Sequence, residues 1–509
     1  MIFDFTFFIS GDFDILKKIL RYEAMQNAIE FEEEFVQPRY IFRLETDEQK
    51  MLDFAQKISQ QIPLSLYFKF ENIQVSQKTE IVYKQYDTQE VLGANDFGSI
   101  IQNQDMTLLQ KWIQDVVFFD KEIKNDFSVA FEALVQKFIA TKKLVIKNAR
   151  GKFSLSLNQK TSKAIFWDVE ALKTYLRIQD MQIQALASYE KPSVIITPKE
   201  VFIKDFGTDL LECILPYDLF LGILGKKCLE KGIDYAFIAS EEDVLDISYN
   251  QEVSKQECLV VAQNGYLLFL GENKAKNIYD IIHSYEVLID DKNKQNLVAC
   301  LSTKNPWIFW IGNDDKFQSA INFDFELNPK ILFSMIEKLE NGTSLIKNFS
   351  KNFPELAQRV QDFDSESKKS KNIFDFLAVV AFILGYSDDF SSIIIDNARK
   401  YVRDKGPRID FKLARNEDKT LTLEYIKILR SSMSFRLAGV DEATLSYGIL
   451  DSMSEFFCNF IQDLSTNFAL DRVLVFGDAL KEKMILDRIF GYKPKNIDFL
   501  LPQKGYLDY

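Results

Sequence analysis

Alternating apolar positions, followed by apolar residues at helical spacing, mark the first part of the chain. Residues 2–9 (IFDFTFFI) alternate like a half-buried strand, and residues 13–25 have the spacing of an amphipathic helix. Residues 32–44 favour a strand, residues 47–60 a second helix and residues 63–70 another strand. This β-α-β-β-α-β order over about eighty residues predicts a small ferredoxin-like module. On the second helix we expect the inner face to hold Leu52, Phe54, Ala55 and Ile58.

The middle of the chain changes from a polar, aperiodic segment to an α/β pattern. Residues 71–125 are polar and, over 76–104, aperiodic, which predicts a linker with helices near its end. From Phe127 onward a helix over 129–140 leads into a strand over 142–147. The alternation of helix and strand is typical of a larger α/β domain.

Further elements are predicted in the second half of the chain. Residues 257–270 (ECLVVAQNGYLLFL) are two strands joined by Asn264-Gly265, a residue pair that favours a type I′ hairpin. An apolar, buried helix is predicted over 371–385, and another helix over 439–464.

The stretch 472–490 has the layout of strand, glycine turn and helix. Residues 472–476 (RVLVF) form a short apolar run, Gly477-Asp478 interrupt it, and residues 479–490 carry apolar residues at helical spacing. Backbone N–H groups at the start of such a helix can bind a phosphate, although ordinary βα connections have the same layout. The pattern alone leaves both interpretations open.

Composition and charge narrow the class of protein. The chain has 509 residues, 47% of them hydrophobic and 27% charged, which is typical of a globular protein with several domains. Its net charge of −13 and the lack of a basic, aromatic-rich stripe argue against nucleic-acid binding. The apolar run 376–384 is too short to span a bilayer, and the acidic residues within positions 1–20 are unlike a signal peptide. We therefore expect a cytoplasmic protein without membrane insertion.

The cysteines and the single histidine bear on metal and nucleophile chemistry. The five cysteines are scattered and form no Cys-x-x-Cys pair, which indicates core residues in a reducing compartment. They are Cys213, Cys228, Cys258, Cys300 and Cys458. His283 alone cannot supply an ordinary zinc site, and no nucleophile motif lies near it in the sequence.

Residues 476–482 (FGDALKE) and 499–505 (FLLPQKG) resemble two motifs at the end of the HypF family, the carbamoyltransferases that mature nickel–iron hydrogenases. The family has Ser-Gly-Gly-Val-Phe-x-Asn in the first motif and Pro-x-Asn-Asp-Gly-Gly in the second. In this chain Asp478 replaces a glycine, Glu482 replaces the asparagine and Lys504 replaces a metal-binding aspartate. The frame of both motifs is kept, and their chemistry is altered.

Residues 147–155 (KNARGKFSL) resemble the nucleotide-binding, YrdC-type domain of the same family, which has Lys-Gly-x-Gly-Gly-Phe-His-Leu at this place. Lys147, Gly151 and Phe153 match, whereas a glycine and the histidine of the motif are replaced. The arginine-rich helix that follows in the family is reduced to Leu176-Arg177. Most of the positive charge that would hold a triphosphate is therefore missing.

Two more segments are similar to parts of the family. Residues 10–13 (SGDF) stand where the acylphosphatase-like domain has Gly-Val-Gly-Phe-Arg, without the arginine that holds the phosphate. Gly271 and Glu272 match the opening Gly-Asp-Leu-Glu-Asn of an ATPase-like domain shared with sugar kinases and actin. Residues 302–307 (STKNPW) represent the metal-binding His-Asp-x-x-Pro-x-Tyr segment, without its histidine or its acid.

The resemblance implies a multidomain fold of the mixed α/β and α+β class. A degenerate acylphosphatase-like module is expected at 1–80 and a linker or helical segment at 81–125. A degenerate YrdC-like domain is expected at 126–253, and an ATPase-like, carbamoyltransferase-like domain of sugar-kinase and actin type at 254–509.

Two functions follow from the resemblance. The motifs keep their order but have lost most of their functional residues, and in this the chain resembles shortened accessory relatives of the family. The resemblance implies a factor that binds hydrogenase subunits or other maturation proteins. The alternative is a carbamoyltransferase that uses ATP and carbamoyl phosphate to supply the cyanide-ligand precursor of the hydrogenase metal centre. ATP with Mg²⁺ is then the expected cofactor. The residues expected to contact nucleotide or phosphate are Lys147, Gly151, Gly271, Glu272, Gly477 and Asp478.

Overall fold

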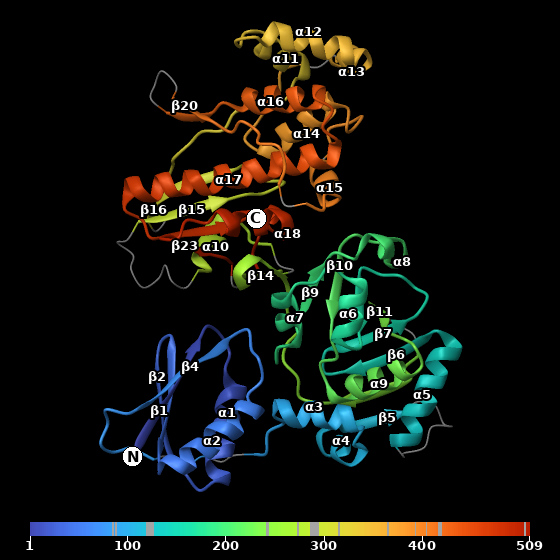
Figure 1. Cartoon of the computed structure of the whole chain (residues 1–509), viewed down its shortest axis with the longest axis vertical. Coiled ribbons are helices and arrows are strands. Elements are labelled where there is room, and N and C mark those ends of the chain that lie inside the picture. Colours follow the sequence, from blue (N-terminus) through green and yellow to red (C-terminus); the bar gives the residue numbers. More distant parts are fainter. Residues whose placement is uncertain are drawn as a thin grey trace. The chain divides into compact units, whose positions relative to one another are not determined.

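The structure of the chain is a computed structural model (Figure 1). It describes residues 1–83, 86, 89–118, 127–240, 244–271, 274–285, 295–313, 316–363, 366–391, 393–403, 405–415, 420–502 and 505–509. These residues form two compact units, Met1–Leu259 and Val260–Tyr509. The finer boundaries expected at residues 80, 125 and 253 stay predictions.

The N-terminal module is a four-stranded antiparallel sheet with two helices packed on one face (Figure 1). Its elements are β1 (Ile2–Ile9), α1 (Asp14–Gln26), β2 (Glu30–Val36), β3 (Arg39–Glu45), α2 (Glu48–Gln61) and β4 (Phe68–Val75). The strand order β2-β3-β1-β4 is the predicted ferredoxin-like arrangement. Phe5, Phe42 and Phe54 are almost fully buried in its core, between the sheet and the helices.

Three local expectations in this module differ from the structure. The strand expected over 32–44 is two strands, because the chain turns at Gln37-Pro38, and the strand expected from residue 63 begins only at Phe68. On α2 the buried residues are Met51, Phe54 and Ile58, whereas Leu52 is 52% exposed. Neighbouring helical residues differ by about 100° around the axis, so Leu52 lies outside the buried face.

A mixed sheet forms the rest of the N-terminal unit, with the strand order β13-β9-β10-β8-β11-β7-β6-β12-β5. The strands are β5 (Gln114–Phe118), β6 (Lys143–Asn148), β7 (Gly151–Ser156), β8 (Lys163–Phe166), β9 (Ser193–Ile196), β10 (Leu211–Ile214), β11 (Tyr235–Ser240), β12 (Ile247–Asn250) and β13 (Cys258–Val261). The chain leaves the unit along β13, whose Cys258 and Leu259 pair with β9.

Helices complete this unit, and two of them lie in the segment that was expected to be a linker with helices near its end. The helices are α3 (Ala94–Asn103), α4 (Met106–Trp112), α5 (Phe127–Thr141), α6 (Val169–Tyr175), α7 (Asp180–Ala187), α8 (Ile203–Phe206) and α9 (Leu219–Glu230). Ile100 of α3 and Leu109 of α4 are buried in one core with Phe131 and Leu224. Strand β5 also lies in this segment and pairs with β12, which the aperiodic pattern did not predict.

The C-terminal unit is built on a five-stranded sheet of order β17-β16-β15-β22-β23. The strands are β15 (Asn296–Cys300), β16 (Ile308–Asn313), β17 (Lys316–Ser319), β22 (Arg472–Phe476) and β23 (Asp498–Leu500). Strand β22 pairs parallel with β15 on one side and β23 on the other. The long helix α17 (Glu442–Phe468) runs beside this sheet (Figure 1).

The other elements of the C-terminal unit are mostly helices. They are β14 (Leu267–Phe269), α10 (Ile278–His283), β18 (Phe325–Glu326), α11 (Pro329–Glu337), α12 (Gly342–Asn352), α13 (Pro354–Gln361), β19 (Lys369–Ser370), α14 (Ile373–Leu384), α15 (Ile393–Arg399), β20 (Leu413–Arg415), β21 (Leu421–Leu423), α16 (Tyr425–Leu437) and α18 (Lys483–Tyr492). In α14 every residue except Asp375 is buried, as the apolar pattern predicted. Among the described residues, none of the helices has both the length and the apolar composition needed to cross a bilayer.

The predicted fold class is confirmed as a mixed α/β, multidomain architecture, and one predicted helix starts later than expected. The helix expected over 479–490 is divided into a 3-10 turn at Asp478–Lys481 and helix α18, which begins at Lys483. The N-terminus of a long helix therefore does not follow Gly477 directly. The helix expected over 439–464 is α17 and extends to Phe468.

Candidate functional site

The carboxyl ends of three parallel strands meet at one edge of the C-terminal sheet. Strands β15, β22 and β23 are parallel, so the segments that follow Cys300, Phe476 and Leu500 leave the sheet together. Open α/β sheets commonly bind ligands at the carboxyl ends of their strands. Two of the predicted contact residues, Gly477 and Asp478, lie here.

The carboxylate of Asp478 binds the loop that follows β15. Ser302 donates its hydroxyl to Oδ1 of Asp478 at 2.9 Å. The Thr303 backbone N–H donates to Oδ1 at 2.6 Å, and the Thr303 hydroxyl donates to Oδ2 at 2.6 Å. Both oxygens of the carboxylate thus accept hydrogen bonds from the chain itself.

Gly477 lies against the backbone of Leu301. Its φ of 121° belongs to a region that favours glycine, and a Cβ added there would lie 2.0 Å from the Leu301 carbonyl oxygen. The Leu301 N–H donates to the Phe476 carbonyl at 2.9 Å, and the Ala479 N–H donates to the Leu301 carbonyl at 3.3 Å. The glycine therefore admits a neighbouring segment of the same chain.

Glu482, at the position of the family's asparagine, forms a two-pronged ion pair with Arg399 of α15. The Arg399 Nε donates to Oε2 at 2.9 Å, and its Nη2 donates to Oε1 at 2.5 Å. Such paired contacts fix both side chains in orientation as well as in position. The pair joins α15 to the turn that precedes α18.

Gly271 meets the C-terminal segment rather than Gly477. Its N–H donates to the Gly505 carbonyl at 3.3 Å, and a Cβ on Gly505 would lie 2.1 Å from the Gly271 nitrogen. Gly505 has a φ of 71°, so both its conformation and its neighbour require glycine. Two positions named in the sequence analysis, Glu272 and Lys504, lie outside the described residues.

A second contact joins the C-terminal segment to the loop after β15. The Asn305 amide nitrogen donates to Oδ1 of Asp508 and, at 3.3 Å, to the Tyr509 carbonyl. Burial raises the pKa of the Cys300 thiol, and the carboxylates of Asp478 and Asp508 raise it further. Both acids therefore lie near the buried end of β15.

Lys147 and Gly151 lie in the N-terminal unit, at the turn between β6 and β7. Lys147 is exposed and pairs across the hairpin with Lys152. Gly151 has a φ of 115°, and no atom lies within 4 Å of a Cβ added there. Glycine is therefore favoured at position 151 by the backbone conformation and not by a close neighbour.

Arg150, at the same turn, is directed into the protein. Its guanidinium lies over the Tyr217 ring at 4.0 Å from the centroid. It donates to the carbonyls of Glu190 at 2.8 Å, Lys191 at 2.9 Å and Ser254 at 3.3 Å. No sequence pattern predicts this role of Arg150, because the acceptors are backbone atoms far along the chain.

A buried polar cluster next to this arginine was also missed by the sequence patterns. Asp218 accepts hydrogen bonds from Tyr249 at 2.9 Å, from Asn148 at 3.1 Å and from the Leu221 N–H at 2.7 Å, where it caps α9. Burial raises the pKa of Asp218 to about 6, although these hydrogen bonds oppose the increase. The one usable signal was an aspartate directly before an apolar helix.

The loop before α1, where the family holds its phosphate, is closed by Tyr67. The Ser10 N–H and hydroxyl donate to the Tyr67 carbonyl at 2.7 and 3.2 Å. A Cβ on Gly11 would lie 2.4 Å from the Tyr67 ring, and Asp12 accepts the Asp14 N–H at 3.0 Å. The aspartate therefore binds a backbone N–H of its own chain, at the first residue of α1.

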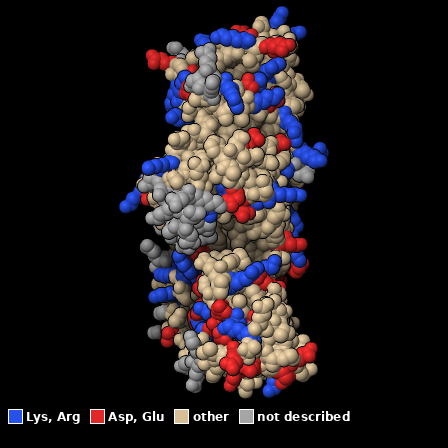
Figure 2. All heavy atoms as spheres, turned by 90° about the vertical axis from the view of Figure 1, so that its left-hand side faces the viewer, with Lys and Arg blue, Asp and Glu red and all other residues tan. Residues whose placement is uncertain are grey.

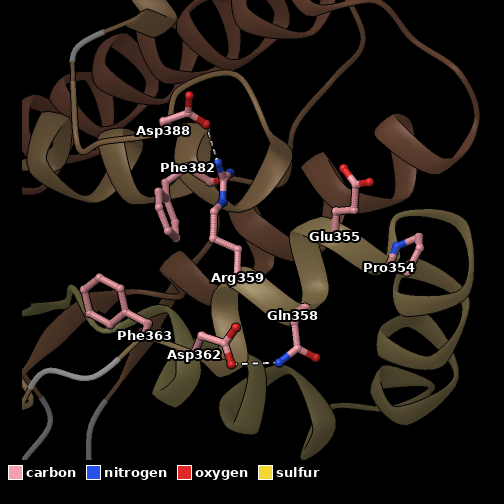
Figure 3. Close-up of a pocket in the computed structure, with 8 residues that line it drawn as sticks. All are labelled: Pro354, Glu355, Gln358, Arg359, Asp362, Phe363, Phe382 and Asp388. Atoms are coloured by element: carbon pink, nitrogen blue, oxygen red, sulfur yellow. Dashed lines mark hydrogen bonds and ion pairs between the residues drawn. The ribbon is translucent and has the colours of Figure 1, made fainter.

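An open groove of about 900 Å³ lies along α13 and the end of α14. Figure 3 shows Arg359 in this groove between Phe382 and Asp388. Its guanidinium lies 4.2 Å from the centroid of the Phe382 ring and 2.9 Å from the Asp388 carboxylate. Gln358 and Asp362 form a hydrogen bond at its rim, at 2.7 Å. Arg359 thus has its acidic partner, Asp388, within the groove.

Neither charged side chains on one face of the molecule nor metal-binding groups among the described residues mark a site. On the face drawn in Figure 2, the coloured acidic and basic side chains are interspersed. Within the described residues, no group of three or more His, Cys, Asp or Glu side chains is placed to hold a metal ion.

Comparisons with known proteins identify relatives along nearly the whole chain. Protein HydE of Wolinella succinogenes is 29% identical over 546 aligned positions, which cover 99% of both proteins. A full-length HypF in its phosphate- and nucleotide-bound form has a TM-score of 0.55 and 11% identity, over 96% of this chain and 94% of that one. The HypF of T. kodakarensis has a TM-score of 0.58 and 9% identity, over 98% and 95%. No protein-family model matches the chain.

These comparisons confirm the resemblance inferred from the short motifs. The chain is similar to HydE from end to end, and it has the fold of full-length HypF. The nucleotide and phosphate contacts expected from the six motif residues stay predictions.

Proposed function

We propose that this chain, a HydE-like protein with the HypF fold, is an accessory factor in the maturation of nickel–iron hydrogenases. It acts by binding hydrogenase subunits or other maturation proteins in the cytoplasm. It does not itself transfer a carbamoyl group, or does so only weakly.

The contact between Asp478 and the loop after β15 carries this proposal. The two segments joined there are those in which the family has a glycine-rich motif and metal-binding residues. In this chain one supplies a carboxylate and the other supplies the donors that bind it. A negative charge at a phosphate site also repels the phosphates that it would have to admit.

Two other positions support the same interpretation. Gly477 is filled on its open side by the Leu301 carbonyl, and Gly11 is covered by the Tyr67 ring. In both places a glycine that would give a phosphate access to the backbone is used for packing within the chain.

Nucleotide binding tests this proposal against the carbamoyltransferase alternative. Calorimetry is done on the full chain with ATP, with and without Mg²⁺ and carbamoyl phosphate. We expect no heat of binding at millimolar nucleotide. Micromolar binding of ATP by the wild-type chain would overturn the proposal. Its loss in Gly477→Asp and Gly271→Asp would establish an altered enzyme site only where thermal unfolding shows that both variants are folded, because position 477 packs against the Leu301 backbone.

A complementation experiment tests the role in the cell. A strain that lacks the gene is supplied with wild-type protein or with the Lys147→Ala or Lys152→Ala variant, and its hydrogenase activity is measured. Both lysines are exposed, so the variants should fold. We expect activity to be restored by all three proteins, with the hydrogenase subunits captured equally by each. Loss of activity with normal capture would favour the carbamoyltransferase instead.

A further inference from the structure

A partly open cavity of about 620 Å³ lies within the N-terminal unit. Helix α1 of the ferredoxin-like module forms one wall, and residues 89–97 form a second. The loops that follow α2, α7 and β12 complete the lining, together with Trp112 and Tyr217. Its volume is in the range of pockets that enclose small organic ligands.

One lysine on the wall of this cavity has no anionic partner. The Lys191 ammonium donates to the Ala187 carbonyl at 3.0 Å and lies 5.8 Å from the centroid of the Phe97 ring. Among the described residues, no carboxylate lies within ion-pair distance of it. A charged group in a partly enclosed site is costly unless an opposite charge is supplied.

Arg150 forms hydrogen bonds with the backbone at this lysine. The guanidinium binds the carbonyls of Glu190 and Lys191, so a second cation lies close to the first. The nearby Glu190 carboxylate is directed elsewhere. It accepts the Ser65 hydroxyl at 2.5 Å and the Leu66 N–H at 3.0 Å.

The other cations that line the cavity already have partners. Lys18 lies 3.1 Å from Asp14 and 3.3 Å from Glu252, and Arg21 lies 2.6 Å from Glu33. The uncompensated charge in the cavity is therefore the positive charge of Lys191. The remaining wall is mixed. Aromatic and apolar side chains (Phe97, Trp112, Tyr189, Tyr217 and Val253) lie beside polar ones such as Gln89 and Gln251, and Glu90 is paired with Lys111.

From this geometry we propose that the cavity binds a small organic carboxylate with an aromatic or branched apolar body. The carboxylate pairs with the Lys191 ammonium, and the body packs against the aromatic wall. The pairing supplies the anion that the lysine lacks, and burial of the body adds about 25 cal/mol per Å² of apolar surface. This site is separate from the proposed accessory function and does not depend on it.

The protonation of Lys191 supports this inference. Burial lowers the pKa of this lysine to about 8, and the neighbouring Arg150 lowers it further, whereas Glu190 opposes the change. An anion bound beside the ammonium favours its charged form and raises the pKa again. At pH 8 about half of the Lys191 side chains are neutral, so binding should take up about half a proton.

Calorimetry with benzoate and the neutral benzamide tests the proposal on the full-length protein. The two probes share their size and aromatic ring and differ in charge. We expect benzoate to bind at least tenfold more tightly than benzamide at pH 8. Repeating the titration in buffers of different ionisation enthalpy should give an uptake of about half a proton per benzoate.

Variants at position 191 separate the charge from the cavity. Lys191→Met should weaken benzoate binding at least tenfold and leave benzamide binding unchanged. Lys191→Arg should keep benzoate binding but abolish the proton uptake, and Lys226→Met, an exposed lysine, should behave like wild type. Equal binding of the two probes, or undiminished benzoate binding by folded Lys191→Met, would overturn the proposal. Absence of any benzoate binding at 10 mM would overturn it as well.

Discussion

Thr303 and Asp478 form a closed contact in which both the backbone N–H and the hydroxyl of the threonine donate to the carboxylate, each at 2.6 Å. The residues lie on loops that follow two adjacent parallel strands, β15 and β22. The contact therefore joins the carboxyl ends of these strands without any ligand. Hydrogen bonds to an ionised carboxylate are stronger than neutral ones, which makes this contact a structural link in the C-terminal unit.

Replacing Asp478 should weaken the C-terminal unit. Asp478→Asn presents an amide N–H to donors, and Asp478→Gly removes all three hydrogen bonds. Each variant should lose about 2–4 kcal/mol of unfolding free energy. Urea unfolding measures the loss, and hydrogen exchange should be faster in peptides that cover residues 296–313 and 472–492.

The exposed Asp498 provides a matched control for this prediction. Asp498→Asn should change stability by less than about 0.5 kcal/mol. In a double-mutant cycle, Asp478→Gly combined with Thr303→Val should cost less than the sum of the two single changes. Additive effects would mean that the two side chains do not stabilise one another.

Two glycines with similar backbone angles should respond differently to alanine. Gly477 and Gly151 have φ values of 121° and 115°, but only the Cβ at position 477 would collide with the backbone, at Leu301. Gly151→Ala should cost about 1–3 kcal/mol from conformation alone. Gly477→Ala should cost more than about 4 kcal/mol or prevent folding of its unit. Thermal unfolding of both variants measures the difference, and equal losses would contradict the packing of Gly477 against Leu301.

The contribution of the ion pair between Arg399 and Glu482 to stability should require a carboxylate at position 482. Glu482→Asn introduces the residue that the HypF motif has at this place and removes one prong of the pair. We expect a loss of about 1–3 kcal/mol, because the partly buried Arg399 loses one acidic partner and keeps Asp396. Urea unfolding at low and high salt measures this loss. The exposed Glu355→Gln is the control and should have no effect. A normal stability of Glu482→Asn would show that the pair is not needed.

The sequence predicted much of the fold because the relevant signals are local. Alternation in residues 2–9 and the apolar stretch of α14 are properties of neighbouring residues, and both elements form where expected. The start of α18 was misplaced because Asp478 is bound by Thr303, which lies 175 residues away. A single sequence contains no local sign of such a partner.

The lack of local signals for distant partners also explains which features of the candidate sites were not predicted. Asp478 was identified by its motif, but whether its carboxylate faces a ligand or the chain depends on the loop after β15. Lys191 carries no motif for a cavity, since the surrounding walls come from α1, α3 and the loop after β12. The carbonyls that Arg150 binds likewise lie 40 to 104 residues away along the chain. Helices near the end of segment 71–125 were expected, but the packing of Ile100 and Leu109 into a core with distant residues was not.

The stability of the N-terminal unit should depend on pH through Asp218. Burial raises the folded-state pKa of Asp218 from 3.8 to about 6, so between these values the folded state binds more protons than the unfolded state. The contribution of Asp218 therefore stabilises the protein at low pH and is lost as pH rises through this window, by on the order of 2–3 kcal/mol. Asp218→Asn cannot ionise and should lack this loss. Urea unfolding at pH 4, 5, 6 and 7 measures the difference in unfolding free energy between wild type and variant. Relative to wild type, the unfolding free energy of the variant should increase as pH rises from 4 to about 6. Above that pH the difference should level off. A difference that is the same at all four pH values would mean that Asp218 titrates normally in the folded protein.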